Sequence, residues 1–157
     1  MVQILAPAES LDPQTRVAIV VSRFNEALTA DLLRGATTTL VEQGIEETRI
    51  DVAWVPGAWE IPLALDRLAR TGRYGALLAL GVVIRGETTH DRQINRFVSL
   101  SIGELSLKYS VPIGMGLLTC NNTKQALRRA DPARRNKGGE TARAALEMLR
   151  LCATFQD

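Results

Sequence analysis

The sequence predicts an α/β protein in which a four-stranded parallel sheet lies between two layers of helices. Short, almost wholly apolar segments alternate along the chain with segments whose apolar residues recur every three or four positions. The apolar segments have the composition of strands buried on both faces, which is typical of parallel sheets. This alternation favours right-handed crossovers with helices on both faces, and therefore a three-layer αβα sandwich of the flavodoxin-like type.

Four segments have the pattern expected of strands. They are residues 17–21, 50–55, 76–84 and 111–118. The second is terminated by the turn-forming pair Pro56-Gly57. The third is the longest apolar run in the chain, and the fourth contains Pro112 near its start.

Five segments have helical periodicity. They run from Leu28 to Leu40, over residues 61–70, from Ile94 to Tyr109, over a short stretch that ends at Ala130, and from Ala142 to Leu149. Gly44 and Gly72 are expected to end the first two helices. Asn121 or Asn122 is expected to cap the fourth.

Length and composition limit the class of protein. A chain of 157 residues, 46% apolar and 23% charged, is expected to form one domain with its own core. The net charge of +2 does not indicate a nucleic-acid partner. Because no apolar stretch is long enough to span a membrane and no signal peptide is recognisable, we expect a cytoplasmic protein without membrane association. Cys120 and Cys152 lack metal-binding or redox spacing, which agrees with a reducing compartment.

The chemically distinctive side chains follow the predicted strands directly. Phe24 comes after the first strand, Trp59 and Glu60 after the second, and the only histidine, His90, after the third. In parallel α/β sheets, ligands bind beyond the carboxyl ends of the strands. Since these ends lie at one edge of the sheet, we expect the loops to form a binding site there.

The segment from Gly86 to His90 is predicted to bind an anion and to move protons. The amides of Glu87 and Thr88 are expected in the first turn of a helix, where N–H groups lack partners. Arg129 can pair with a bound phosphate through its guanidinium, with the Glu87 side chain pointing away. Histidine changes charge near neutral pH, so His90 is the candidate acid and base.

Each of these residues also has a structural interpretation. His90 fits a helix cap, Phe24 a side chain packed on the next helix, and Glu60 a carboxylate near a helix N-terminus. Lys137 precedes two glycines, which suits either a close approach to a ligand or a turn that leads into a helix. The basic residues between Lys124 and Lys137 suit an anion site or a solvated helix end.

Several catalytic motifs are absent from the sequence. It contains no GxSxG, CxxC or Walker P-loop, and no GxGxxG follows the first strand. A single histidine cannot build a histidine-rich metal site, so no metal is expected. The remaining chemistry is acid–base catalysis on a phosphorylated small molecule beside a stacked ring.

Six motifs occur in order along the chain and resemble those of the lumazine synthase family. They lie in residues 23–25, 55–62, 81–90, 116–119, 125–130 and 136–138. The resemblance runs from about residue 14 to the C-terminus without large gaps. It implies that an aminopyrimidine with a ribitylamino chain condenses with dihydroxybutanone phosphate in riboflavin biosynthesis. The products are dimethyl-ribityl-lumazine, phosphate and water, and neither metal nor cofactor takes part.

The resemblance also implies roles for individual residues, with His90 and Arg129 as the catalytic pair. The pyrimidine stacks on Phe24, the ribityl chain lies along Ala58, Trp59 and Glu60, and the ring edge contacts Val82, Val83 and Ile84. The phosphate is bound by the amides of Glu87 and Thr88 and by Arg129, and His90 moves protons. Met115 and Lys137 complete the pocket from a neighbouring subunit.

At three positions the sequence departs from the common family pattern. Trp59 and Met115 stand where phenylalanine is usual, and Asp91 stands where an aromatic residue is usual. The first two keep an apolar surface, so we expect the pocket to change in shape more than in chemistry.

The resemblance implies a homo-oligomer, since family members form pentamers and some pack pentamers into icosahedral shells. The single domain covers residues 1–157, and residues 1–13 form an arm expected to add a strand to a neighbour's sheet. Riboflavin synthase is an implied partner.

Two alternatives with the same fold are a non-catalytic flavin or lumazine binder and a shell-forming structural protein. Neither needs His90, Arg129 and Lys137 together, so their joint presence favours the synthase.

Overall fold

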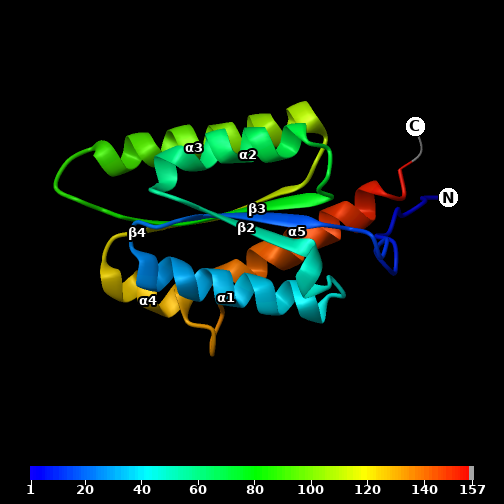
Figure 1. Ribbon diagram of the computed structural model, residues 1–157, viewed down its shortest axis with the longest axis horizontal. Coiled ribbons are helices and arrows are strands. Elements are labelled where there is room, and N and C mark those ends of the chain that lie inside the picture. The colour runs from blue at the N-terminus through cyan, green and yellow to red at the C-terminus, as the bar shows by residue number, and fades with distance from the viewer. Residues whose placement is uncertain (156–157) are drawn as a thin grey trace.

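The computed structural model describes residues 1–155, which contain four strands and five α-helices. In chain order these are β1 (Val17–Ser22), α1 (Glu26–Glu42), β2 (Ile50–Val55), α2 (Ile61–Arg70), β3 (Ala76–Ile84), α3 (His90–Tyr109), β4 (Ile113–Cys120), α4 (Thr123–Ala130) and α5 (Lys137–Cys152). Two short 3-10 helices, η1 (Glu47–Arg49) and η2 (Ala58–Glu60), precede β2 and α2 (Figure 1).

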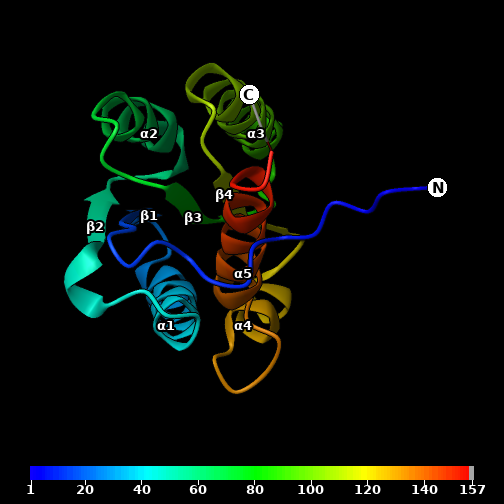
Figure 2. The same cartoon turned by 90° about the vertical axis from the view of Figure 1, so that its right-hand side faces the viewer.

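The strands form one parallel sheet in the order β2-β1-β3-β4. Helices α2 and α3 cover one face, and α1, α4 and α5 cover the other (Figures 1 and 2). The predicted three-layer, flavodoxin-like arrangement is therefore confirmed. Because the strands are parallel, their carboxyl ends share one edge of the sheet, and the loops after β1, β2 and β3 meet there.

Alternating residues of the interior strand β1 face two separate apolar layers. Val17, Ile19 and Val21 pack with the core on the side of α1 and α5, whereas Ala18 and Val20 pack with the core beneath α2 and α3. All five are at most 1% exposed. Full burial of a valine or isoleucine side chain stabilises a fold by about 1.5–3 kcal/mol. The sheet is thus a firmly packed base for the loops at its carboxyl edge.

The strand and helix boundaries mostly follow the sequence pattern, with β3 and α2 found at residues 76–84 and 61–70 as predicted. The fourth strand differs, because residues 111–118 were expected and the strand is Ile113–Cys120. Pro112 has no N–H to donate, although its carbonyl accepts a hydrogen bond from the amide of Leu77 (3.0 Å). At the other end, Cys120 continues the ladder by pairing with Ile84.

The helix-terminating signals act as expected. Gly44 (φ 100°) and Gly72 (φ 68°) have left-handed backbone conformations just after α1 and α2. Of the two asparagines before α4, Asn122 is the N-cap, and its side chain accepts a hydrogen bond from the amide of Gln125 (2.9 Å).

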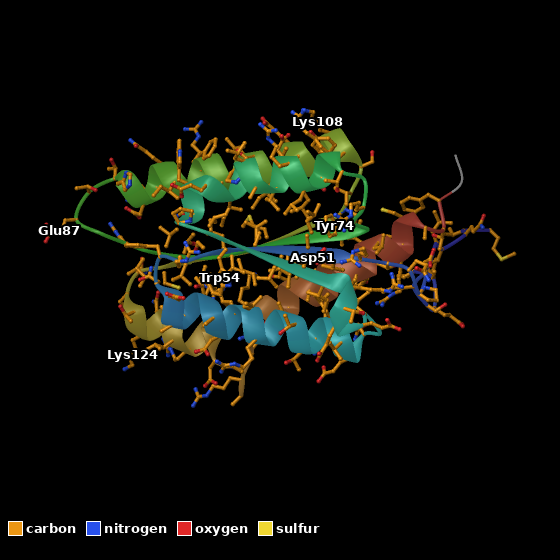
Figure 3. All side chains as sticks on the ribbon, viewed as in Figure 1. Asp51, Trp54, Tyr74, Glu87, Lys108 and Lys124 are labelled. Atoms are coloured by element: carbon orange, nitrogen blue, oxygen red, sulfur yellow. The ribbon has the colours of Figure 1, made fainter. Side chains whose placement is uncertain are left out.

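A polar network joins three segments at the amino edge of the sheet, opposite the predicted site. Arg16 donates hydrogen bonds of 2.9 and 3.1 Å to the Asp51 carboxylate, and the Tyr74 hydroxyl donates another of 2.7 Å. Figure 3 shows Asp51 and Tyr74 close together at this end of the molecule. The hydrogen bonds from Tyr74 and then Arg16 hold the pKa of the Asp51 carboxyl below its ordinary value.

The N-terminal arm extends away from the domain. Ala8 donates a backbone hydrogen bond to the carbonyl of Arg150 in α5 (3.1 Å), and the preceding residues project outward (Figure 2). Val2 and Ile4 are each 86% exposed, so their apolar side chains have little contact with their own domain. None of the helices within residues 1–155 combines the length and the apolar character that crossing a membrane requires.

Candidate active site

A pocket of about 180 Å³ lies at the carboxyl edge of the sheet, where the sequence predicts the site. Its walls come from the loops after β1 and β2, the last residues of β3 with the loop that follows, and the first turns of α3. They are formed by Phe24, Ala58, Val82, Val83, Ile84, Gly86, Thr88, His90, Asp91 and Ile94. The fold thus brings together most of the residues that are expected to contact the pyrimidine substrate, although they come from three separate parts of the chain.

Phe24 is presented by two backbone hydrogen bonds that tie the first loop to the second. Arg23 donates its amide to the carbonyl of Val55 (2.7 Å), and Phe24 donates to Pro56 (3.0 Å). The phenyl ring is left 71% exposed above the pocket. A ring packed firmly against the next helix would be largely covered, so the exposure supports a surface for stacking.

Asn25 fixes the turn between Phe24 and α1, a role that the sequence motif alone did not specify. Its backbone is left-handed (φ 62°), a conformation that asparagine tolerates better than most residues. Its side-chain amide donates to the carbonyl of Val82 on β3 (3.1 Å), and its own carbonyl accepts from Leu28 and Thr29. Asn25 therefore links the loop that carries Phe24 to the strand that lines the pocket.

The second loop forms η2, and its residues point in different directions. Ala58 is buried and lines the pocket. Trp59 is 53% exposed and lies against Phe97 of α3, with ring centroids 4.1 Å apart and planes inclined by 31°. Glu60 donates its amide to the carbonyl of Gly57 (3.2 Å), and its carboxylate lies close to the same glycine. Neither Trp59 nor Glu60 belongs to the pocket wall described above.

The helix that follows the third loop begins later than predicted. Glu87 and Thr88 were expected in the first helical turn, but α3 begins at His90 and its N-cap is Thr89. The helix starts later because the amide of His90 is already bonded to the Thr88 hydroxyl (3.3 Å), which forms a local turn. Within residues 1–155, the amides of Glu87 and Thr88 make no hydrogen bond, so both can still serve an anion.

The side chains in this loop separate into two groups. Figure 3 shows Glu87 at the outer tip of the loop with its carboxylate directed away from the domain, as anion binding requires. Thr88, His90 and Asp91 instead contribute to the pocket wall. His90 is solvent-exposed at the first position of α3, where the helix dipole also favours a negatively charged ligand.

Met115 does not reach this pocket in its own subunit. It lies opposite Ala79 of β3, five residues before Ile84 at the pocket edge. Val82, the nearest residue of β3 that lines the pocket, is three positions from Ala79, which is roughly 10 Å along the strand at about 3.3 Å per residue. Met115 is 46% exposed and lines a different groove, between α3, β4 and α5.

The glycines beside Lys137 serve helix packing. Lys137 begins α5, and the Asn136 side chain caps this helix by accepting from the amide of Gly139 (3.0 Å). A Cβ atom on Gly138 would lie 1.9 Å from the carbonyl oxygen of Leu32 in α1. The two glycines therefore allow the first turn of α5 to pack closely against α1. Neither Lys137 nor the exposed Arg129 of α4 lies in the wall of the pocket.

Four residues near the pocket had no individual site role assigned from the sequence. Gly86, Asp91 and Ile94 line it, and Phe97 lies against Trp59. Ile94 and Phe97 follow His90 by four and seven positions, which places all three on one face of α3. Helical spacing counted from the histidine would have identified them.

Comparison with known proteins agrees with this arrangement. A family model for 6,7-dimethyl-8-ribityllumazine synthase matches residues 14–153, which is 140 of the 157 residues. The matched region includes every strand and α-helix and all loops of the pocket. This family match does not favour the two alternatives, a non-catalytic binder and a structural shell protein. The chain therefore belongs to the 6,7-dimethyl-8-ribityllumazine synthase family and catalyses the condensation of the ribitylaminopyrimidine with dihydroxybutanone phosphate in riboflavin biosynthesis.

Proposed function

We propose that the pocket at the carboxyl edge holds the two substrates for this condensation, with the pyrimidine ring stacked on Phe24. The observation that carries this proposal is the convergence of Phe24, the segment 82–84 and His90 on one pocket. An exposed phenyl ring offers a flat apolar face to a heterocycle, and the strand segment contacts the ring edge. The segment Ala58–Glu60 runs from the pocket wall outward, and we assign to it the ribityl chain.

The phosphate of the second substrate is assigned to the loop after β3. The amides of Glu87 and Thr88 are available there, and the N-terminus of the 20-residue helix α3 lies next to them. Arg129 supplies a guanidinium, which can bind phosphate through two parallel hydrogen bonds. Its side chain is exposed on α4, which permits contact with a site in its own subunit or in a neighbour's.

His90 is assigned the proton transfers. Imine formation between the pyrimidine amine and the ketone, expulsion of phosphate and ring closure each require a proton to be moved near neutral pH. His90 lies in the pocket wall two residues after Thr88 and is therefore near the proposed phosphate position. Holding both substrates in one orientation supplies a large part of the remaining acceleration.

The size of the pocket supports a site completed by a second subunit. A pocket of about 180 Å³ is smaller than the roughly 300–1,000 Å³ typical of small-molecule sites, and here two substrates must fit. Met115 and Lys137 lie outside it in their own subunit, and we assign both to the pocket of the next subunit in a homopentamer. The N-terminal arm, residues 1–13, begins with exposed apolar side chains such as Val2 and Ile4, and we assign it to the edge of a neighbour's sheet.

A complementation experiment tests the shared site. His90→Ala and Lys137→Ala variants are purified, partly dissociated in mild denaturant, mixed and reassembled, and the lumazine chromophore is followed with both substrates. Hybrid assemblies contain some sites in which both positions are intact, so activity should exceed that of either variant alone. As a control, a mixture of His90→Ala with Phe24→Ala should not recover, because both residues belong to one subunit's wall. Equal recovery in both mixtures, or none in either, would contradict the assignment.

Sedimentation velocity distinguishes a pentamer from a shell, because closed symmetric assemblies have fixed sizes and a shell of twelve pentamers has about twelve times the mass.

A cytoplasmic location is proposed as well, and the free, exposed thiol of Cys152 supports it because such thiols persist in reducing compartments. We also propose riboflavin synthase, which consumes the lumazine product, as a partner. Co-sedimentation of the two purified enzymes tests that association.

A further inference from the structure

Trp59 and Phe97 form a close aromatic pair at the border of the pocket. Their ring centroids are 4.1 Å apart and their planes are inclined by 31°, which is close to a stacked arrangement. Trp59 belongs to η2 and Phe97 to α3, which are separated by 38 positions in the sequence. The pair therefore joins two elements that only the fold brings together.

Both partners are continuous with the pocket wall. Ala58, which directly precedes Trp59, is part of the wall on the side of η2. On the side of α3, His90 and Ile94 line the pocket, and Phe97 lies on the same helical face one turn further along. The aromatic pair thus adjoins residues of the wall on both elements, next to Ala58 on η2 and one helical turn beyond Ile94 on α3.

We propose that Phe97 is a positioning residue that holds the Trp59 indole against the ribityl chain of the pyrimidine substrate and so contributes to specificity for that chain. The inference rests on the proposed role of the segment Ala58–Glu60. Trp59 is 53% exposed, and without a partner its indole would sample several rotamers. Contact with Phe97 restricts it before substrate binds, so less conformational entropy is lost on binding. In that position the indole N–H is a hydrogen-bond donor suited to a hydroxyl of the chain.

Steady-state kinetics of Phe97→Ala tests the proposal. Immobilising a side chain or losing an aromatic pair changes an equilibrium by about two- to tenfold, so KM for the ribitylaminopyrimidine should rise by about this factor. The kcat and the KM for dihydroxybutanone phosphate should stay within about twofold. Phe97→Tyr should restore the low KM, because it keeps the ring. Leu100→Ala is the matched control, since Leu100 is an exposed apolar residue on the same helix, 57% exposed, and should leave both KM values unchanged.

A double-mutant cycle separates positioning from general structural damage. If Phe97 acts through Trp59, the KM effect of Phe97→Ala should disappear in a Trp59→Ala background. Thermal unfolding of each variant checks that the fold persists, and Phe97→Leu provides a second variant that keeps apolar volume without the ring. An unchanged pyrimidine KM in Phe97→Ala, or a KM effect that persists undiminished without Trp59, overturns the inference. If Trp59→Ala also leaves the pyrimidine KM unchanged, the assigned role of the η2 segment fails with it.

Discussion

The contact between α1 and α5 leads to a quantitative prediction for the substitution Gly138→Ala. An alanine Cβ at this position would lie 1.9 Å from the carbonyl oxygen of Leu32 and 2.8 Å from the carbonyl carbon. Ordinary contact begins at 3.4 Å, so the two helices must separate by about 1.5 Å. These two nearest atoms belong to backbone and cannot rotate away. Buried side chains along the contact, such as Leu32, Ala36 and Ala142, would lose packing as the helices move apart.

Overpacking of a well-filled core costs about 1–3 kcal/mol, and the clash with the Leu32 backbone places Gly138→Ala at the upper end of this range. For a domain of this length, about 3 kcal/mol corresponds to a decrease in Tm of roughly 6–12 °C. Calorimetry or circular dichroism at one fixed protein concentration provides the measurement, because the stability of an oligomer depends on concentration.

Gly103→Ala provides a matched control on a different helix. Gly103 lies within α3, is exposed, and has no atom within 4 Å of the position its Cβ would occupy. Replacing an unconstrained helical glycine with alanine stabilises a helix by about 0.5–1 kcal/mol, so the same substitution should here raise Tm slightly. A Tm for Gly138→Ala equal to that of the wild type, or equal losses in both variants, would refute the reasoning.

Three further predictions concern pH, proton transfer and phosphate binding. Because the folded-state pKa of Asp51 is lowered, its contribution to stability is present above pH of about 4 and is lost as the pH falls through the folded pKa. Because the Asp51 side chain is 42% exposed, we expect it to contribute at most about 1 kcal/mol to the free energy of unfolding. In Asp51→Asn, the free energy of unfolding measured in urea should therefore depend less steeply on pH. His90→Ala should lower kcat by about a hundredfold or less while substrate binding persists, as followed by lumazine absorbance. Arg129→Ala should raise KM for dihydroxybutanone phosphate by about tenfold and leave the pyrimidine KM unchanged.

The controls for these predictions come from neighbouring residues. Arg128→Ala tests whether any exposed arginine of α4 has the effect predicted for Arg129, and it should leave both KM values unchanged. Tyr74→Phe removes one hydrogen bond to Asp51 and should reproduce part of the flattening. A full rate in His90→Ala would reject the proton-transfer role, and an unaltered KM in Arg129→Ala would reject the phosphate contact. An identical pH dependence in Asp51→Asn and the wild type would exclude the proposed contribution of the network.

The boundaries of several elements followed from local signals. The ends of α2 were predictable because Pro56-Gly57 and Gly72 interrupt the chain on either side of it. The start of β4 also follows from a local signal, since Pro112 cannot donate a hydrogen bond to a strand ladder and β4 begins at Ile113. Its far end was decided by the length of the neighbouring strand β3, with which Cys120 pairs through Ile84. The N-terminus of α3 also depended on detailed geometry, namely the turn closed by the Thr88 hydroxyl.

The sequence by itself determined that Phe24, Ala58 and His90 would meet. Their positions directly after three apolar strands are sufficient, because parallel strands place their carboxyl ends at one edge. Only the tertiary structure decided which atoms stand opposite Gly138 and which ring supports Trp59. It also decided that Met115 lies about 10 Å along the sheet from the nearest pocket-lining residue of β3, Val82, and faces a different groove. These outcomes depend on the register of strands and the crossing of helices, which are set by contacts between distant residues and leave no periodic signal in the chain.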